Sequence, residues 1–173
     1  MSEILIVCYS LTGNTRRVAT VLRDQLHAEL LEIEDAEPRR GILGVLRSVW
    51  ETLAGRTPEI RHDPCDPAAY RLVVLSTPVW AARPAPPLVS FLDRHQGNLP
   101  EVAFLCTLGG SGAKSTFDRL AKITGKPPAA TLAITDAHRK AGEDTALVHG
   151  FGDTLKGYLN KRHAPEEPGE RTE

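Results

Sequence analysis

A loop near the N-terminus combines hydroxyl, amide and glycine residues in an order that could bind an anion. It consists of Ser10, Leu11, Thr12, Gly13, Asn14 and Thr15. The hydroxyl and amide side chains can donate hydrogen bonds, and Gly13 lets the backbone come close to a ligand. If a helix begins here, its first N–H groups lack helical partners and carry partial positive charge. The loop therefore predicts a phosphate site. The alternative is an ordinary helix start, capped by Asn14 or Thr15 and without a ligand.

The sequence on either side of this loop predicts the elements that would hold it. Residues 4–9 form a short apolar, β-branched run, which is typical of a strand buried on both faces. After the loop, Val18, Leu22 and Leu26 recur at a spacing of four, which predicts a helix with one apolar face. A strand, a loop of small residues and a helix are thus expected in succession.

The rest of the chain alternates in the same way. Further strands are predicted at 30–33, 71–76, 102–106 and 131–135, and further helices at 42–53, 86–92, 117–124 and 147–159. The helix at 42–53 has a broad apolar face that would pack on the core or cover a dimer surface. Residues 57–68 and 77–84 are predicted loops. Five strands alternating with helices indicate an α/β fold with a parallel sheet and helices on both faces.

The pattern Ser10-x-Thr12-Gly13-Asn14-Thr15 resembles the flavodoxin phosphate-binding motif and matches every fixed position of it. The resemblance covers the chain up to about Arg162, so we expect one flavodoxin-like domain at 1–162 and a polar, disordered tail at 163–173. It implies a doubly wound five-stranded parallel sheet of order 2-1-3-4-5. It also implies that the loop binds the 5′-phosphate of FMN.

Two other loops would enclose the isoalloxazine ring of FMN if the resemblance holds. They follow the third and fourth strands and reach the same sheet edge as the first loop. The residues carried over are Thr77, Pro78, Val79, Trp80, Thr107, Leu108, Gly109, Gly110 and Gly112. Trp80 could stack on the ring or lie at a partner surface.

The sequence does not support two other functions that involve phosphate, nucleotide binding by a Walker A loop and phosphorylation of a response-regulator receiver. Gly109–Ser115 is similar to a Walker A loop, but Ala113 separates the last glycine from Lys114. A response-regulator receiver needs acidic residues after the first and third strands, where this chain has Ser10 and Pro78.

Composition and net charge indicate which kinds of partner, location and bound metal to expect. The 173 residues carry a net charge of −1, which gives no reason to expect nucleic acid as a partner and differs from the strongly acidic flavodoxins that carry electrons. No apolar run is long enough for a membrane span or a signal peptide, so we expect a cytoplasmic protein.

Cys8 and Cys106 should lie about 10 Å apart on strands separated by a third strand, which is too far for a disulfide. The histidine spacings predict no metal site.

The predicted function is that of an FMN-dependent oxidoreductase of the NAD(P)H or quinone reductase kind, which passes electrons from a reduced donor to a small acceptor. The three loops contain no Asp or Glu, so repulsion of a second electron should be weak and two-electron chemistry is favoured. No catalytic side chain is predicted, because hydride transfer needs mainly positioning. The alternative is a flavodoxin-type electron carrier for a protein partner. A vestigial loop, or one that binds another phosphate ligand, and a homodimer also stay open.

Overall fold

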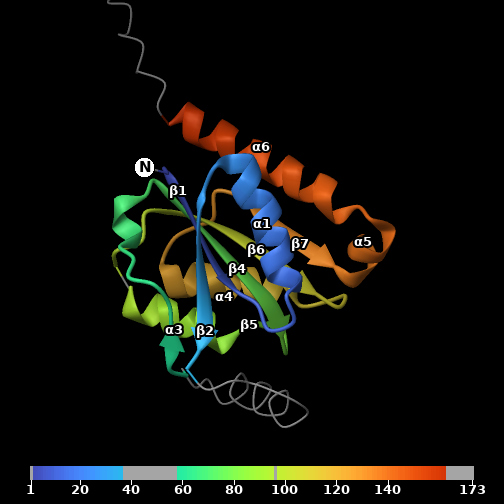
Figure 1. The fold of residues 1–173 in the computed structure, drawn as a ribbon, viewed down its shortest axis with the longest axis horizontal. Coiled ribbons are helices and arrows are strands. Elements are labelled where there is room, and N and C mark those ends of the chain that lie inside the picture. The colour runs from blue at the N-terminus through green and yellow to red at the C-terminus, as the bar shows by residue number, and fades with distance from the viewer. Residues whose placement is uncertain (1, 37–57, 96, 163–173) are drawn as a thin grey trace, which may run out of the picture.

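The computed structural model describes residues 2–36, 58–95 and 97–162, which form a sheet between layers of helices (Figure 1). The strands are β1 Ile4–Tyr9, β2 Glu29–Asp35, β3 Ile60–Arg61, β4 Leu72–Trp80, β5 Arg83–Pro84, β6 Glu101–Leu108 and β7 Thr131–Thr135. The helices are α1 Asn14–Leu26, α3 Pro86–Arg94, α4 Ala113–Thr124, α5 Asp136–Ala141 and α6 Asp144–Lys161, with a 3₁₀ turn at Pro67–Ala69. None of the helices in these ranges is long and apolar enough to cross a bilayer. The helix predicted at 42–53 and the tail at 163–173 lie outside the described residues.

Five of the strands are parallel, in the order β2-β1-β4-β6-β7. In chain order these are the first to fifth parallel strands, so the predicted α/β doubly wound sheet of order 2-1-3-4-5 is confirmed. Two short antiparallel strands extend it: β3 pairs with β2 at one edge, and β5 pairs with the end of β4. The strand order reverses between β1 and β4.

The core lies on both faces of the sheet because β1 is buried along its whole length. On one face Ile6 and Cys8 pack beneath α1 and α6. On the other face Leu5 and Val7 pack with the apolar side chains of α3 and with Leu120 of α4. In Figure 1, α1 and α6 lie on one side of the sheet and α3 and α4 on the other. This burial on two faces explains the continuous apolar run of β1.

Several predicted boundaries were wrong, and the largest error concerns β4. Thr77–Trp80 was predicted as loop but continues the strand, and Arg83–Pro84 forms β5. Pairing with β1 ends at Ser76, whereas pairing with β6 continues to Pro78. Thr77 and Pro78 therefore pair with β6 but not with β1, and a proline, which has no N–H, is tolerated where one side of a strand is unpaired.

The remaining boundary errors are smaller. Thr107 and Leu108 end β6 instead of starting a loop, and the predicted loop at 57–68 contains β3. The short helix α5 was not predicted, because its polar sequence has no apolar periodicity.

Candidate functional site

The three predicted loops meet at the carboxyl end of the sheet, next to the point where the strand order reverses. The first loop joins β1 to α1, the second forms the end of β4 and its hairpin with β5, and the third joins β6 to α4. Ligands of open α/β sheets bind outside such a reversal point. The topology thus brings the predicted site residues to one edge of the sheet (Figure 1).

The first loop leaves the start of α1 without a side-chain cap. Gly13 is the N-cap residue, at φ 87°, and no side chain caps the helix, so the alternative of a cap by Asn14 or Thr15 was wrong. The Arg17 N–H donates to the Gly13 carbonyl at 3.0 Å. The N–H groups before Arg17 belong to the first turn, where helical acceptors are missing. A Cβ added at Gly13 would meet no atom of the described residues within 4 Å, which leaves room for a ligand beside the loop.

Ser10 supplies the clearest sign of a missing partner. Its Oγ atom is buried, yet it has no hydrogen-bond partner among the described residues. An unpartnered buried hydroxyl costs about 1–3 kcal/mol, so most buried hydroxyls in proteins are bonded. The Ser76 hydroxyl is buried too and has no partner within the part of the chain that the structure describes; Ser76 lies beside Cys8 in the pairing of β1 with β4. A ligand with acceptor oxygens would satisfy the donor at Ser10.

A hydroxyl pair joins the first loop to the third. The Thr15 and Thr107 Oγ1 atoms lie 2.7 Å apart, and the two residues are 1% and 5% exposed. Thr12 and Asn14 form a second, exposed hydrogen bond of 3.1 Å. The buried pair fixes the beginning of α1 against the end of β6.

The charges beside this loop are neutralised in pairs. Arg16 and Arg17 lie in the first turn of α1, where the helix dipole disfavours cations. The Arg16 Nε atom donates to Glu32 at 2.5 Å, and Arg17 forms an ion pair with the buried Asp144. Burial alone would raise the pKa of Asp144, but the hydrogen bond and charge of Arg17 bring that pKa below its usual value. The groups that this loop offers to an anion are therefore neutral hydrogen-bond donors, because its two arginines are already paired with carboxylates.

The second loop is held more tightly than its sequence indicated. Thr77 is fully buried, and its hydroxyl accepts a hydrogen bond from the Ala85 N–H at 3.0 Å. Pro78, Val79 and Trp80 are partly exposed at the end of β4. Their side chains, rather than the Thr77 hydroxyl, are available to a ligand.

Tyr9 borders the candidate site but is not among the residues predicted from the sequence. Its ring meets Trp80 edge to face, with centroids 5.7 Å apart and an interplanar angle of 87°. The Tyr9 hydroxyl donates to the Asp35 carboxylate at 2.6 Å. The signal was present, since Tyr9 is the last residue of the buried strand and directly precedes Ser10. Trp80 is thereby oriented by a buried side chain.

The third loop combines open and crowded glycines. Gly109 and Gly110 are exposed, and a Cβ at either position would meet no atom within 4 Å. Gly112, at φ 98°, is the N-cap of α4 and is crowded by the hairpin after β4. The open glycines would let a flat ligand approach the backbone.

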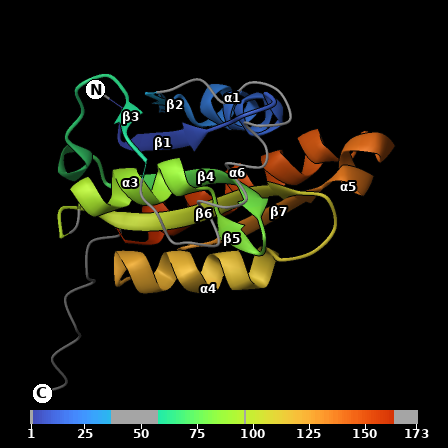
Figure 2. The same ribbon diagram turned by 90° about the horizontal axis from the view of Figure 1, so that it is seen from below.

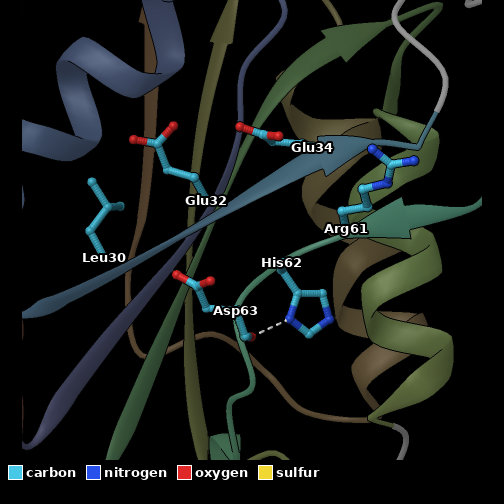
Figure 3. A pocket seen from close by; sticks show the side chains of 6 residues that line it. All are labelled: Leu30, Glu32, Glu34, Arg61, His62 and Asp63. Carbon is cyan, nitrogen blue, oxygen red and sulfur yellow. Dashed lines mark hydrogen bonds between the residues drawn. The ribbon is translucent and has the colours of Figure 1, made fainter.

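A separate cavity of about 580 Å³ lies along β2 and the segment after β3 (Figure 3). It is lined by Leu30, Glu32, Glu34, Arg61, His62 and Asp63. The close-up view shows the carboxylate side chains of Glu32, Glu34 and Asp63, and a His62 ring nitrogen is 2.7 Å from the Asp63 carbonyl oxygen. With three carboxylates and none of the predicted site residues in its lining, it is unsuited to a phosphate.

The cysteines lie as the strand order predicted. Cys8 on β1 and Cys106 on β6 are separated by β4, and all three thiols are free. Burial raises the pKa of both Cys8 and Cys106 to about 12, so these two thiols stay protonated at neutral pH. Over the described ranges, no three His, Cys, Asp or Glu side chains are grouped to hold a metal ion.

Comparison with known proteins establishes the fold. No protein-family model and no curated protein matches the sequence. Among solved structures, a flavoprotein in complex with FMN from Lactobacillus acidophilus is 24% identical, with a TM-score of 0.67 over 82% of this chain and 98% of that one. A candidate flavoprotein from Bacteroides eggerthii is 22% identical, with a TM-score of 0.73 over 90% and 99%. The two-electron reduced flavodoxin of Megasphaera elsdenii is 15% identical, with a TM-score of 0.52 over 87% and 98%.

The strand order and the similarity to these structures show that the chain has the flavodoxin-like fold, as the resemblance of its first loop predicted.

Proposed function

We propose that this protein binds FMN and acts as an oxidoreductase that passes electrons from a reduced donor, such as NAD(P)H, to a small acceptor, such as a quinone. The observation that carries the proposal is the unpartnered, buried Ser10 hydroxyl beside the uncapped start of α1. A phosphate group would satisfy both the hydroxyl and the first helical N–H groups. The FMN complex of the Lactobacillus acidophilus flavoprotein, which has the same fold, supports FMN as the ligand.

The residues present fit such a ligand. Ser10–Thr15 would hold the phosphate with backbone N–H groups, hydroxyls and the Asn14 amide, and Gly13 leaves room for its oxygens. Val79 and Trp80 would cover one part of the ring, and Gly109 and Gly110 would let backbone groups meet its polar edge.

FMN, when bound, would supply the redox chemistry, and the protein would supply position and electrostatics. The buried Thr15–Thr107 pair keeps the first and third loops at a fixed separation. Pro78 has no N–H and a fixed φ, so the backbone of the second loop has little freedom to rearrange between redox states. Two-electron chemistry follows from this stiffness and from the absence of Asp and Glu in the three loops. Of the carboxylates close to these loops, Glu32 and Asp144 are paired with arginines, and Asp35 accepts a hydrogen bond from the Tyr9 hydroxyl.

The charge of the chain favours a small acceptor over a protein partner. A net charge of −1 offers little long-range attraction for steering a redox protein to the site. An electron carrier serving a protein partner is the second candidate, favoured by the flavodoxin among the structural neighbours. A cytoplasmic location and a homodimer remain predictions.

The absorption spectrum of the purified protein tests the cofactor first. We expect flavin bands in the visible range, either as purified or after addition of FMN, and release of FMN on heating. A protein that stays colourless with excess FMN would refute the cofactor assignment and leave the fold unchanged.

Steady-state assays then separate the two candidates. The oxidoreductase should oxidise NAD(P)H in the presence of a quinone without any other protein. The carrier should turn over only after a flavin reductase is added. The second outcome would refute the proposed enzyme activity while retaining FMN binding.

A further inference from the structure

The turn between β4 and β5 has an unusual backbone. Trp80 pairs with Arg83, so Ala81 and Ala82 form a two-residue hairpin turn. Their φ values are 48° and 57°, the pattern of a type I′ turn, which normally selects asparagine and glycine. Two alanines are disfavoured in this conformation because their Cβ atoms crowd the backbone. Some other contact must hold the turn in place.

Gly112, at the start of α4, lies directly against this turn. A Cβ at Gly112 would lie 2.9 Å from the Ala82 Cα atom and 3.1 Å from the Val79 Cγ1 atom. The backbone of the third loop therefore touches the backbone of the hairpin. β5 packs against α4, and Figure 2 shows the two side by side. The other end of the hairpin is fixed by the hydrogen bond from Ala85 to the Thr77 hydroxyl.

The other glycines show that a left-handed N-cap does not by itself explain Gly112. Gly13 is the N-cap residue of α1 at φ 87°, and Gly125 ends α4 at φ 67°, yet a Cβ at either would meet no atom of the described residues within 4 Å. At Gly152 the three atoms nearest to an added Cβ belong to the flexible side chain of Gln25. Among the glycines of the described ranges, Gly112 alone has the backbone of another element as the nearest neighbour of an added Cβ.

We propose that Gly112 is a positioning residue that joins the start of α4 to the β4–β5 hairpin and so sets the separation of the second and third loops. This inference rests on the proposed function, because those two loops would enclose the flavin ring. A side chain at position 112 would push Val79 and Trp80 away from Gly109 and Gly110. The slot between the loops would lose its preformed width, and a flat ligand would bind more weakly.

The test compares Gly112→Ala with Gly125→Ala. Both substitutions place alanine at a positive φ at an end of α4, but only the first introduces the contact with the hairpin. Both are made with Trp50→Phe, which leaves Trp80 as the sole tryptophan. Two quantities are measured: the near-ultraviolet circular dichroism of the apoprotein, which reports Trp80 against Tyr9, and the dissociation constant of FMN.

We expect Gly112→Ala to change the Trp80 signal and to weaken FMN binding by about tenfold or more, and Gly125→Ala to change neither. Equal FMN affinity and unchanged dichroism in the two variants would overturn the inference and leave the proposed function standing. If the parent protein binds no FMN, the proposed function fails, and an altered Trp80 signal confined to Gly112→Ala would still support the contact.

A second variant covers the case in which Gly112→Ala does not fold. Val79→Ala removes the Cγ1 atom that would lie 3.1 Å from the new methyl group. Added to Gly112→Ala, it should restore folding in part, judged by thermal unfolding of the apoprotein. The Ala82 Cα atom at 2.9 Å remains, so the rescue is expected to be partial. A double variant no more stable than Gly112→Ala would show that the Val79 side chain takes no part in the contact, and the proposed displacement of Val79 would be wrong.

Discussion

Replacing Ser10 with alanine should make the apoprotein more stable and its FMN complex weaker. The buried Ser10 Oγ atom has no partner in the described part of the chain, and such a hydroxyl costs about 1–3 kcal/mol. Removing it also loses the packing of one oxygen atom, so we expect a net gain of about 1 kcal/mol. A hydrogen bond to a charged phosphate is worth about 1.5–3 kcal/mol, so FMN affinity should fall about tenfold to a hundredfold.

Urea unfolding of the apoprotein and titration with FMN measure the two effects. Ser90→Ala is the matched control, because Ser90 is 4% exposed and its hydroxyl donates to the Pro58 carbonyl at 2.7 Å. This control should destabilise the protein by about 1 kcal/mol and leave FMN affinity unchanged. The reasoning is refuted if Ser10→Ala destabilises the apoprotein as much as Ser90→Ala, or if FMN binds both variants equally well.

Three further substitutions test other parts of the structure. Thr107→Val should destabilise the apoprotein by about 1–3 kcal/mol, because it leaves the buried Thr15 hydroxyl unpaired. Adding Thr15→Val should recover much of this loss. Urea unfolding of the two single variants and the double variant measures the coupling, and additive costs would show that the two hydroxyls do not interact. Ala82→Gly relieves a φ of 57° and should raise the free energy of unfolding by about 0.5–1 kcal/mol; a lower melting temperature would contradict this. Burial and then the charge of His62 lower the pKa of His95, so its contribution to stability is present above about pH 6.5 and is lost as the pH falls below that value. Between pH 7 and 5 the free energy of unfolding should therefore fall less in His95→Gln than in the parent protein. An equal fall in the two proteins would contradict the lowered pKa of His95.

The parts of the site that depend on local chemistry could be predicted from the sequence. The donor types of Ser10–Thr15 and the apolar run before them predicted a strand, a loop and a helix start, and the structure has all three. The buried partners of this loop could not be predicted in this way. Thr107 is 92 residues from Thr15, and the two hydroxyls meet only because β6 lies two strands from β1.

The extent of β4 depended on its neighbours rather than on its own residues. Pro78 marks a break in most central strands, so its sequence favoured a loop. The proline is accommodated because β1 stops pairing at Ser76 while β6 continues alongside. The sequence of one strand does not show where the strand beside it ends.

The hairpin after β4 shows a conflict between local preference and the fold. Ala81 and Ala82 contain no signal for a type I′ turn, and local rules alone would place other residues there. The hairpin can pack this closely against the start of α4 because Gly112, some 30 residues later, has no side chain where Ala82 lies. Local rules tend to fail at sites that the fold uses for a purpose. The failure here falls between two loops of the proposed flavin site, which is where a strained but fixed backbone would give a ligand slot its width.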